Sequence, residues 1–215
     1  MIDHRPKIEG RCDICGSELI TRADDTPEAA RDWVRKQQNA ARRRLFEAAV
    51  PAEYREALYD DLDAAQQGRD AVAGWLASTS RTLLLTGPTG TGKTHAAYAV
   101  LRDAAERGLW VYGASIGTFI RALQPGAVPS PVPKMAEQAE VFLFDDLGAE
   151  RATEWVVEQV GEVFDHRYRE QRRQIITTNS TRDGLEQRLG PRAVSRLAQD
   201  ATVVRFDGPD RRVSW

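Results

Sequence analysis

The sequence has few of the features that would mark a secreted or membrane protein. Its 215 residues include two cysteines, which is too few for a disulfide framework. No apolar run approaches the length of a membrane span, and the first residues, MIDHR, lack the apolar core of a signal peptide. These absences exclude the membrane-embedded and disulfide-rich classes, and they predict a reduced, cytoplasmic protein with no membrane partner.

The sequence also lacks an excess of charge of either sign. Its 30 Lys and Arg residues nearly balance 32 Asp and Glu residues, which gives a formal net charge of −2. Such a chain has no global basic field for nucleic acid, so any nucleic-acid contact must come from local patches. A hydrophobic content of 41% is sufficient for one packed domain with a small appendage.

One segment, GPTGTGKT, fits the pattern of a phosphate-binding loop. The apolar run 82–86 before it predicts a buried parallel strand, and the Ala-rich run 95–107 after it predicts a helix. The loop's N–H groups and the positive end of that helix would bind phosphates. The alternative, a Gly-rich turn with a chance lysine, does not explain this strand–loop–helix context. The nucleotide-binding candidates are Gly87, Pro88, Thr89, Gly90, Thr91, Gly92, Lys93, Thr94 and the adjacent His95.

The side chains of two of these residues have predicted roles in addition to the phosphate contacts of the backbone N–H groups. Lys93 would bring a positive charge to the β- and γ-phosphates, and the Thr94 hydroxyl would help to hold Mg²⁺. The sequence therefore predicts a nucleoside triphosphate and Mg²⁺ as cofactors.

A second candidate site follows the apolar run Val141–Phe144, which predicts another buried strand. Asp145 and Asp146 come directly after it, at the strand end where ligands bind in open α/β sheets. We expect Asp145 to hold Mg²⁺, usually through water, and Asp146 to orient or deprotonate the attacking water. The alternative is a strand that simply ends in polar residues. Asp146 is one methylene shorter than the Glu more often expected there, which predicts slow or partner-dependent hydrolysis; Glu150 is a less favoured base.

Asn179 is the last residue of a further predicted strand, 174–179. We expect its amide to lie beside the two acids and to hydrogen-bond the γ-phosphate or the water; a plain turn asparagine is the alternative. The remaining strands are predicted at 109–112 and 202–206. Helices are predicted at 64–78, 115–123, 153–173, 185–189 and 193–197. The end of the helix 153–173 is basic, from Arg167 to Arg173; these cations suit a helix C-terminus, and contact with DNA is the alternative. The Pro-rich run 124–134 predicts an exposed loop, either a linker or a mobile segment that touches DNA or a partner.

Together, GPTGTGKT, VFLFDDLG and TTN resemble the Walker A, Walker B and sensor 1 motifs of AAA+ ATPases. The resemblance implies a three-layer α/β P-loop NTPase core with a central parallel five-stranded sheet, and it implies hydrolysis of ATP with Mg²⁺. The segment LGPRAVSRL resembles the arginine-finger motif of that family, with Arg196 as the finger and Arg192 as its companion. A finger acts on the nucleotide of a neighbouring subunit, so this part of the resemblance implies self-association.

Within AAA+ proteins, the chain resembles the DnaC/DnaI helicase loaders and the IstB transposition helpers, from about residue 50 onward. The stretches that carry this resemblance are VPAEYREALYDDLD, FDDLGAE, IITTNS and LGPRAVSRL. Few residues follow the last predicted strand, so we expect no helical lid domain. The resemblance implies a protein that loads a hexameric replicative helicase onto single-stranded DNA; the alternative is an IstB-like helper of a DNA transposase. A small-molecule kinase and a protein that only binds ATP are rival hypotheses from other classes.

The predicted domains are a partner-binding module, 1–49, and the ATPase core, 50–215. In the module, Cys12 and Cys15 have the spacing of one zinc knuckle. A closed zinc site needs four ligands, so His4 or a second chain would have to contribute, and a knuckle without metal is the alternative. The run 24–49 predicts a helix with an Arg-rich cluster, 42–44, that is either a solvated face or a contact for phosphates or an acidic partner.

Overall fold

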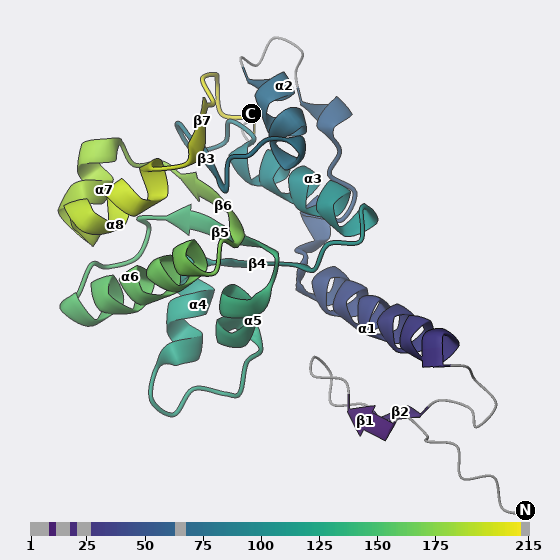
Figure 1. Ribbon diagram of the computed structural model, residues 1–215. Coiled ribbons are helices and arrows are strands. Elements are labelled where there is room, and N and C mark those ends of the chain that lie inside the picture. The colour runs from purple at the N-terminus through teal and green to yellow at the C-terminus, as the bar shows by residue number, and fades with distance from the viewer. Residues whose placement is uncertain (1–8, 12–17, 21–26, 63–67, 212–215) are drawn as a thin grey trace, which may run out of the picture. The chain divides into compact units, whose positions relative to one another are not determined.

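The computed structural model describes residues 9–11, 18–20, 27–62 and 68–211 (Figure 1). The chain divides into two compact units, Met1–Ala48 and Ala49–Trp215. The first unit contains an antiparallel hairpin of β1 (Glu9–Arg11) and β2 (Glu18–Ile20). It also contains nearly all of α1 (Pro27–Ala49), which confirms the helix predicted there from residue 27 onward. In the part of the chain that the structure describes, no helix is long and apolar enough to cross a membrane.

The second unit is built on a five-stranded sheet in which every neighbouring pair of strands is parallel. The strand order is β4-β5-β6-β3-β7, so the strand that leads into the glycine-rich loop lies between β6 and β7. This arrangement confirms the predicted central parallel sheet. The strands are β3 (Thr82–Thr86), β4 (Val111–Ser115), β5 (Val141–Leu147), β6 (Arg173–Thr178) and β7 (Ala201–Arg205).

Helices cover both faces of the sheet, with α3 on one face and α4, α5 and α6 on the other (Figure 1). Hydroxyl side chains begin several of them: Ser115 caps α4, Thr153 caps α6 and Thr181 caps α7 by accepting a backbone N–H of the first turn. The helices are α2 (Arg69–Gly74), α3 (Lys93–Glu106), α4 (Ile116–Leu123), α5 (Val132–Gln138), α6 (Glu154–Arg169), α7 (Arg182–Leu189) and α8 (Pro191–Ala198). The short 3-10 turns are η1 (Ala52–Tyr54), η2 (Tyr59–Asp61) and η3 (Trp75–Ala77).

The core explains why β5 is apolar on both faces. The rings of Phe142 and Phe144 lie 4.5 Å apart on one face, and Phe144 meets Phe164 of α6 edge-on at 5.0 Å. Leu143 points to the opposite face, because side chains alternate along a strand. All four side chains are buried, as expected for a strand covered by helices on both sides.

Several predicted segments differ from the structure; the helix predicted at 64–78, for example, is α2 followed by η3. The strand predicted at 109–112 begins two residues later, because Leu109 still donates its N–H to the carbonyl of Ala104 at the end of α3. Helix α6 ends at Arg169 rather than residue 173, since Gln171 has a φ of 52° and reverses the chain. The loop predicted at 124–134 was wrong in its last part, because 132–138 form α5, whose early prolines are compatible with a first helical turn.

Two arginines near the end of that predicted helix, Arg167 and Arg173, also have a different environment from the one expected. Arg167 is fully buried and donates to the carbonyls of Ala136 and Ala139 at the end of α5. Burial lowers its pKa to about 9. Arg173 is the first residue of β6 rather than part of a helix end. These two guanidinium groups therefore cross-link the fold through backbone carbonyls of other elements.

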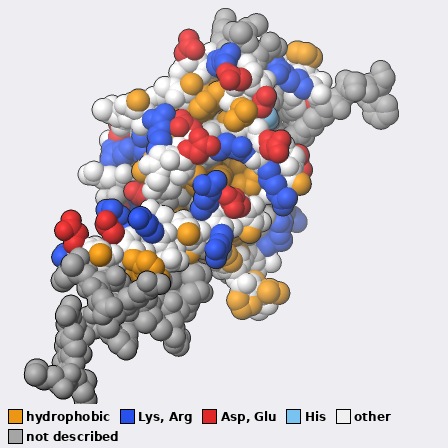
Figure 2. Space-filling model, turned by 90° about the vertical axis from the view of Figure 1, so that its right-hand side faces the viewer, with side chains coloured by type: hydrophobic (Ala, Val, Ile, Leu, Met, Phe, Trp, Pro, Cys, Tyr) orange, Lys and Arg blue, Asp and Glu red, His pale blue; other side chains and the backbone are white. Residues whose placement is uncertain are grey.

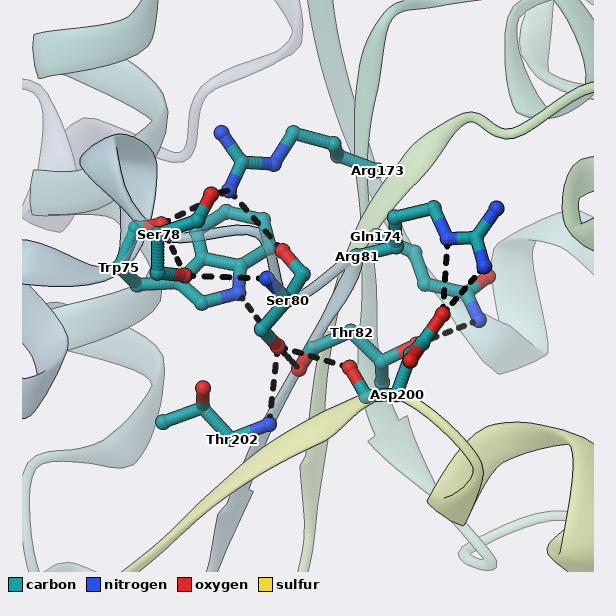
Figure 3. Close-up of polar contacts among 9 residues, drawn as sticks. All are labelled: Trp75, Ser78, Ser80, Arg81, Thr82, Arg173, Gln174, Asp200 and Thr202. Atoms are coloured by element: carbon teal, nitrogen blue, oxygen red, sulfur yellow. Dashed lines mark hydrogen bonds and ion pairs between the residues drawn. The ribbon is translucent and has the colours of Figure 1, made fainter.

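At the amino ends of the strands, the polar side chains form one connected network, which we call the amino edge (Figure 3). Arg173 lies 4.5 Å over the ring of Trp75 and donates to four backbone carbonyls, those of residues 75, 76, 78 and 80. The Ser80 hydroxyl accepts the N–H of Thr202 at 3.0 Å and donates to the carbonyl of Asp200 at 2.7 Å. The network thus joins η3 to three strands of the sheet.

Candidate active site

The glycine-rich loop, 87–92, connects the end of β3 to the start of α3. Gly87 has a φ of 141° and Gly90 has a φ of 78°, both in the region that favours glycine. A Cβ at Gly87 would lie 2.1 Å from the carbonyl oxygen of Phe206, and one at Gly90 would lie 1.7 Å from a carboxylate oxygen of Asp210. The loop therefore needs glycine both for its curvature and for the close approach of the segment after β7.

Lys93 opens α3 and is nearly buried, with 7% of its surface exposed. Its Nζ donates to the carbonyls of Gly87 at 2.8 Å and Pro88 at 2.6 Å. The Thr91 hydroxyl donates to the same Pro88 carbonyl at 2.9 Å. The ammonium is thus held inside the curve of the loop, beside the positive end of α3, where a phosphate group would be attracted.

The first acid is held by hydroxyl groups from two other elements. The Asp145 carboxylate accepts the hydroxyl of Thr94 at 3.0 Å and that of Thr177 at 2.6 Å. Burial raises the pKa of Asp145 above its ordinary value of 3.8, although these two hydrogen bonds act in the opposite direction. A hydroxyl and a carboxylate oxygen side by side fit the hard oxygen ligands that Mg²⁺ prefers, so the donor set fits this ion.

The second acid occupies an unusual backbone conformation. The pairing of β5 with β6 shifts register between Phe144 and Leu147, and Asp146, inside that shift, has a φ of 60°. Asp is one of the few residues that adopt this left-handed conformation at modest cost. Its N–H donates to the Thr177 hydroxyl at 2.8 Å, and the Asn179 amide donates to its carboxylate at 3.2 Å. The local backbone therefore gives a physical reason for Asp at this position.

These side chains line a cavity of about 660 Å³. The structure brings together the loop, the two acids and Asn179, as the spacing of the motifs predicts. The segment from Pro51 to Leu62 lines another part of the cavity. His95 lines it too, and its Nε2 lies 3.1 Å from the Asp61 carboxylate and 3.3 Å from the Leu58 carbonyl. The volume and the mixture of polar and apolar walls suit a nucleotide.

Sequence reasoning missed one cationic residue of this cavity. Arg211 lines it, and the Arg211 backbone N–H donates to the carbonyl of Gly90 at 3.0 Å. The connection begins at Phe206, whose N–H donates to Thr86 at 2.7 Å. No local motif surrounds Arg211, so only the contact of the chain after β7 with the loop identifies it.

The two candidate finger residues do not line this cavity. Arg192 and Arg196 occupy successive turns of α8 and share one partner, Asp165 of α6, at 3.2 Å and 3.6 Å. The Arg196 guanidinium also lies 4.6 Å from the ring centre of Tyr168. The two arginines therefore lie on the same face of α8, toward Asp165. The other predicted residues, His4, Cys12 and Cys15, lie outside the described residues, and those that are described contain no cluster of His, Cys, Asp or Glu that could hold a metal.

A second hollow, of about 490 Å³, adjoins the acid pair between α4 and the start of α6. It shares Asp146 with the nucleotide cavity and presents the half-exposed ring of Trp155 with the cations Arg121 and Arg151. Figure 2 shows one face of the molecule, where basic and acidic side chains are interspersed rather than gathered into a single field.

The parallel α/β sheet, the glycine-rich loop and the acid pair define a P-loop nucleotide-binding protein with the AAA+ arrangement of strands. A model of the family described as "IstB-like ATP binding protein" matches residues 19–212. The chain belongs to this family, and the family's description names ATP as the ligand of its members.

Known proteins agree with this classification. The replicative helicase loader DnaI of Bacillus subtilis (strain 168) is 28% identical over 146 residues, which are 60% of this chain and 47% of that protein. The chain thus spans about half the length of this curated relative. The crystal structure of DnaI matches with a TM-score of 0.67 at 24% identity, covering 76% of this chain and 94% of that one.

Two further structures share the fold. The DnaC helicase loader matches with a TM-score of 0.63 at 22% identity, covering 73% of this chain and 100% of that one. The replication initiator DnaA bound to AMPPCP and single-stranded DNA matches with a TM-score of 0.60 at 19% identity, covering 74% and 51%. At these identities, the similarity concerns the fold alone, and it confirms the predicted α/β core with a central parallel sheet.

The N-terminal residues have a separate similarity. A model described as "Adenylate kinase, active site lid" matches residues 1–24. Adenylate kinase of Pyrococcus furiosus is 70% identical over 23 residues, which are 11% of this chain and 10% of that enzyme. The match is confined to a short segment of the first unit, so it does not extend to the nucleotide cavity.

Proposed function

We propose that this protein binds and hydrolyses ATP and uses the cycle to load a hexameric replicative helicase onto single-stranded DNA. The observation that carries the proposal is the convergence of Lys93, Asp145, Asp146 and Asn179 on one cavity of about 660 Å³. Membership of the IstB-like family and the similarity to DnaI support the choice of process.

The catalytic roles follow from the positions of the side chains. Lys93 and the loop N–H groups bind the phosphates, and Thr94 with Asp145 holds the metal. Asp146 accepts a proton from the attacking water, and Asn179 orients that carboxylate through the 3.2 Å hydrogen bond. Bound ATP and Mg²⁺ supply the reacting phosphoryl group and the neutralisation of its charge.

A complete site requires a second subunit in this proposal. Arg196 lies outside the cavity of its own chain, as expected for an arginine that completes a neighbour's site. Arg211 adds a cation from the same chain. Assembly in the ATP state and release after hydrolysis would then act as a switch.

The second hollow is the proposed contact for single-stranded DNA. The exposed Trp155 ring can stack on a base, while Arg121 and Arg151 can contact phosphates. Asp146 lines both hollows. DNA bound in the second hollow would therefore change the surroundings of the catalytic acid and, with them, the rate of ATP hydrolysis. Such binding should weaken steeply with salt.

Native mass spectrometry of the full-length protein with its host's replicative helicase tests the proposal. We expect a defined complex with ATP and Mg²⁺, and its loss in the Lys93→Ala variant. A complex that forms with a transposase instead would establish the alternative function, an ATPase helper of transposition. A phosphate-release assay on the same mixtures tests the ATPase, and the absence of released phosphate in all of them would contradict it. Transfer of the γ-phosphate to a small-molecule acceptor would identify a kinase.

The N-terminal unit, predicted as the module 1–49, is the proposed contact for the helicase. A zinc ion at Cys12 and Cys15 remains a prediction for this module. Elemental analysis of the purified full-length protein tests it. A stoichiometry of one zinc per two chains would support a site shared between copies, and a zinc content near zero would contradict metal binding.

A further inference from the structure

We propose that Asp165 and Tyr168 are positioning residues that hold Arg196 ready to act on the nucleotide of a neighbouring subunit. This inference rests on the proposed function, because it assumes that Arg196 acts in trans. It assigns a task to the face of α6 that packs against α8, outside the nucleotide cavity.

The contacts of Arg196 leave one edge of its guanidinium available. Its Nε faces the Asp165 carboxylate at 3.6 Å, and its planar face lies 4.6 Å from the ring centre of Tyr168. In the part of the chain that the structure describes, its two terminal nitrogens donate no hydrogen bond. The side chain is 36% exposed. The edge formed by its two terminal nitrogens suits bidentate contact with a phosphate.

Arg192 provides an internal comparison. It meets the same carboxylate through a terminal nitrogen, Nη2, at 3.2 Å, and its side chain is 80% exposed. No aromatic ring contacts it within the described residues. Arg192 is therefore held at the end that would have to reach a phosphate, whereas Arg196 is held at the opposite edge. The difference makes Arg196 the better prepared of the two.

The ring beneath Arg196 is itself supported. The guanidinium of Arg81 lies 5.5 Å from the centre of the Tyr168 ring and forms an ion pair with Asp200. The backbone carbonyl of Asp200 accepts the Ser80 hydroxyl at 2.7 Å (Figure 3). The amino edge thus supports the Tyr168 ring on which Arg196 packs. A catalytic group held in this way loses little conformational entropy when it contacts the transition state.

In this proposal each active site is composite: one subunit supplies the nucleotide cavity and its neighbour supplies Arg196. An experiment that mixes two variants tests the two contributions separately. Acceptor subunits carry Arg196→Ala and keep an intact nucleotide cavity. Donor subunits carry Lys93→Ala and keep Arg196. Neither population should hydrolyse ATP well alone, while their mixture should do so when single-stranded DNA and Mg²⁺ are present.

Asp165→Asn or Tyr168→Leu is then added to the donor only. We expect the kcat of the mixture to fall by about 10-fold or more, with the KM for ATP unchanged, because a small displacement of a catalytic group is costly. Tyr168→Phe in the donor should keep the rate, since the ring face remains. Glu162→Gln is the matched control, because it removes one negative charge from the exposed side of α6 without touching either arginine.

Each outcome decides between the claims. If the unmodified donor fails to stimulate the acceptor, the finger in trans and the proposed composite site are both wrong. If the donor stimulates but Asp165→Asn and Tyr168→Leu match the Glu162→Gln control, the composite site stands and the positioning role is overturned. An equal loss with Tyr168→Phe would also overturn the role assigned to the ring.

Discussion

At the carboxyl ends of the strands, Lys93, Asp146 and Asn179 line an open cavity of about 660 Å³. At the amino ends, Arg173 and Ser80 direct their donors to backbone carbonyls of neighbouring elements. Both ends of this sheet are rich in charged and polar groups. The difference is that the groups at the carboxyl ends line an open cavity, whereas the donors at the amino ends are directed to carbonyls within the fold. We infer that the carboxyl edge is arranged to bind a ligand and the amino edge to hold the sheet together.

The comparison predicts that the largest loss of activity follows Lys93→Ala. ATP hydrolysis should fall by at least about 1000-fold, because this ammonium is the charge placed inside the phosphate loop. The free energy of unfolding should change by about 1 to 2 kcal/mol, because the Lys93 contacts with the Gly87 and Pro88 carbonyls lie at the wall of an open cavity. Phosphate release and urea unfolding measure the two effects.

Lys134→Ala is the control for that variant, because Lys134 is an exposed lysine of α5 in the same unit. Its ATPase activity should stay within about twofold of the unchanged protein. A Lys93→Ala variant that hydrolyses ATP normally would remove the main support for the nucleotide site.

At the amino edge the expected pattern reverses. Arg173→Leu should lower the free energy of unfolding by about 3 kcal/mol, because it leaves several backbone carbonyls without a donor and removes the guanidinium from the Trp75 ring. Activity per folded molecule should be unchanged. Arg173→Lys keeps the charge but not the fork of donors, and we expect it to lose about half as much. Equal urea midpoints for all three proteins would contradict the structural role of the amino edge.

The smallest effect concerns pH at the carboxyl edge. Since burial raises the pKa of Asp145 above 3.8, protons compete with Mg²⁺ at a higher pH than they would at an exposed carboxylate. Mg²⁺ affinity should fall by up to about tenfold per pH unit as the pH drops below that pKa. In the protein without metal the sign reverses: protonated Asp145 favours the fold, and this contribution is lost as the pH rises from 3.8 through the raised pKa.

Thr177→Val sharpens that test, because it removes the 2.6 Å hydrogen bond that favours the ionised carboxylate. The loss of Mg²⁺ affinity, followed by titration calorimetry at several pH values, should then begin at a higher pH. Asp145→Asn should bind Mg²⁺ weakly at every pH and show little slope. A slope that persists in Asp145→Asn would assign the proton to another group.

Local patterns predicted much of the nucleotide-binding core. The strand at 82–86 and the acid-bearing strand from Val141 were both found where expected, since a short apolar run between glycine-rich or polar segments leaves few alternatives. The helix 132–138 was missed because three nearby prolines indicate a loop. Its Val132, Met135 and Ala136 are nonetheless buried, so packing decided what local propensity did not.

The site shows the same division. The motifs placed Lys93, Asp145, Asp146 and Asn179 on loops and strand ends that meet in a parallel sheet, so their convergence could be predicted. The positive φ of Asp146 and the contact between Arg211 and the loop could not, because both depend on register and on where the chain after β7 runs. The interpretation of residues 167–173 as a basic helix end holds only for Arg167 and Arg169, which lie in the last turn of α6. Arg173 begins β6, and Arg167 is buried, which a charge count does not reveal.

By itself, the sequence determined the fold family, the phosphate loop and the order of the catalytic groups, because these depend on short-range chemistry and on strand periodicity. Tertiary structure alone decided three things: which arginines cross-link the sheet, which cations approach the cavity, and how Arg196 is supported. Each depends on contacts between segments far apart in the chain. Such contacts arise only when the helices pack on both faces of the sheet, and with them the carboxyl ends of the strands come to line a cavity while the amino ends form a network within the fold.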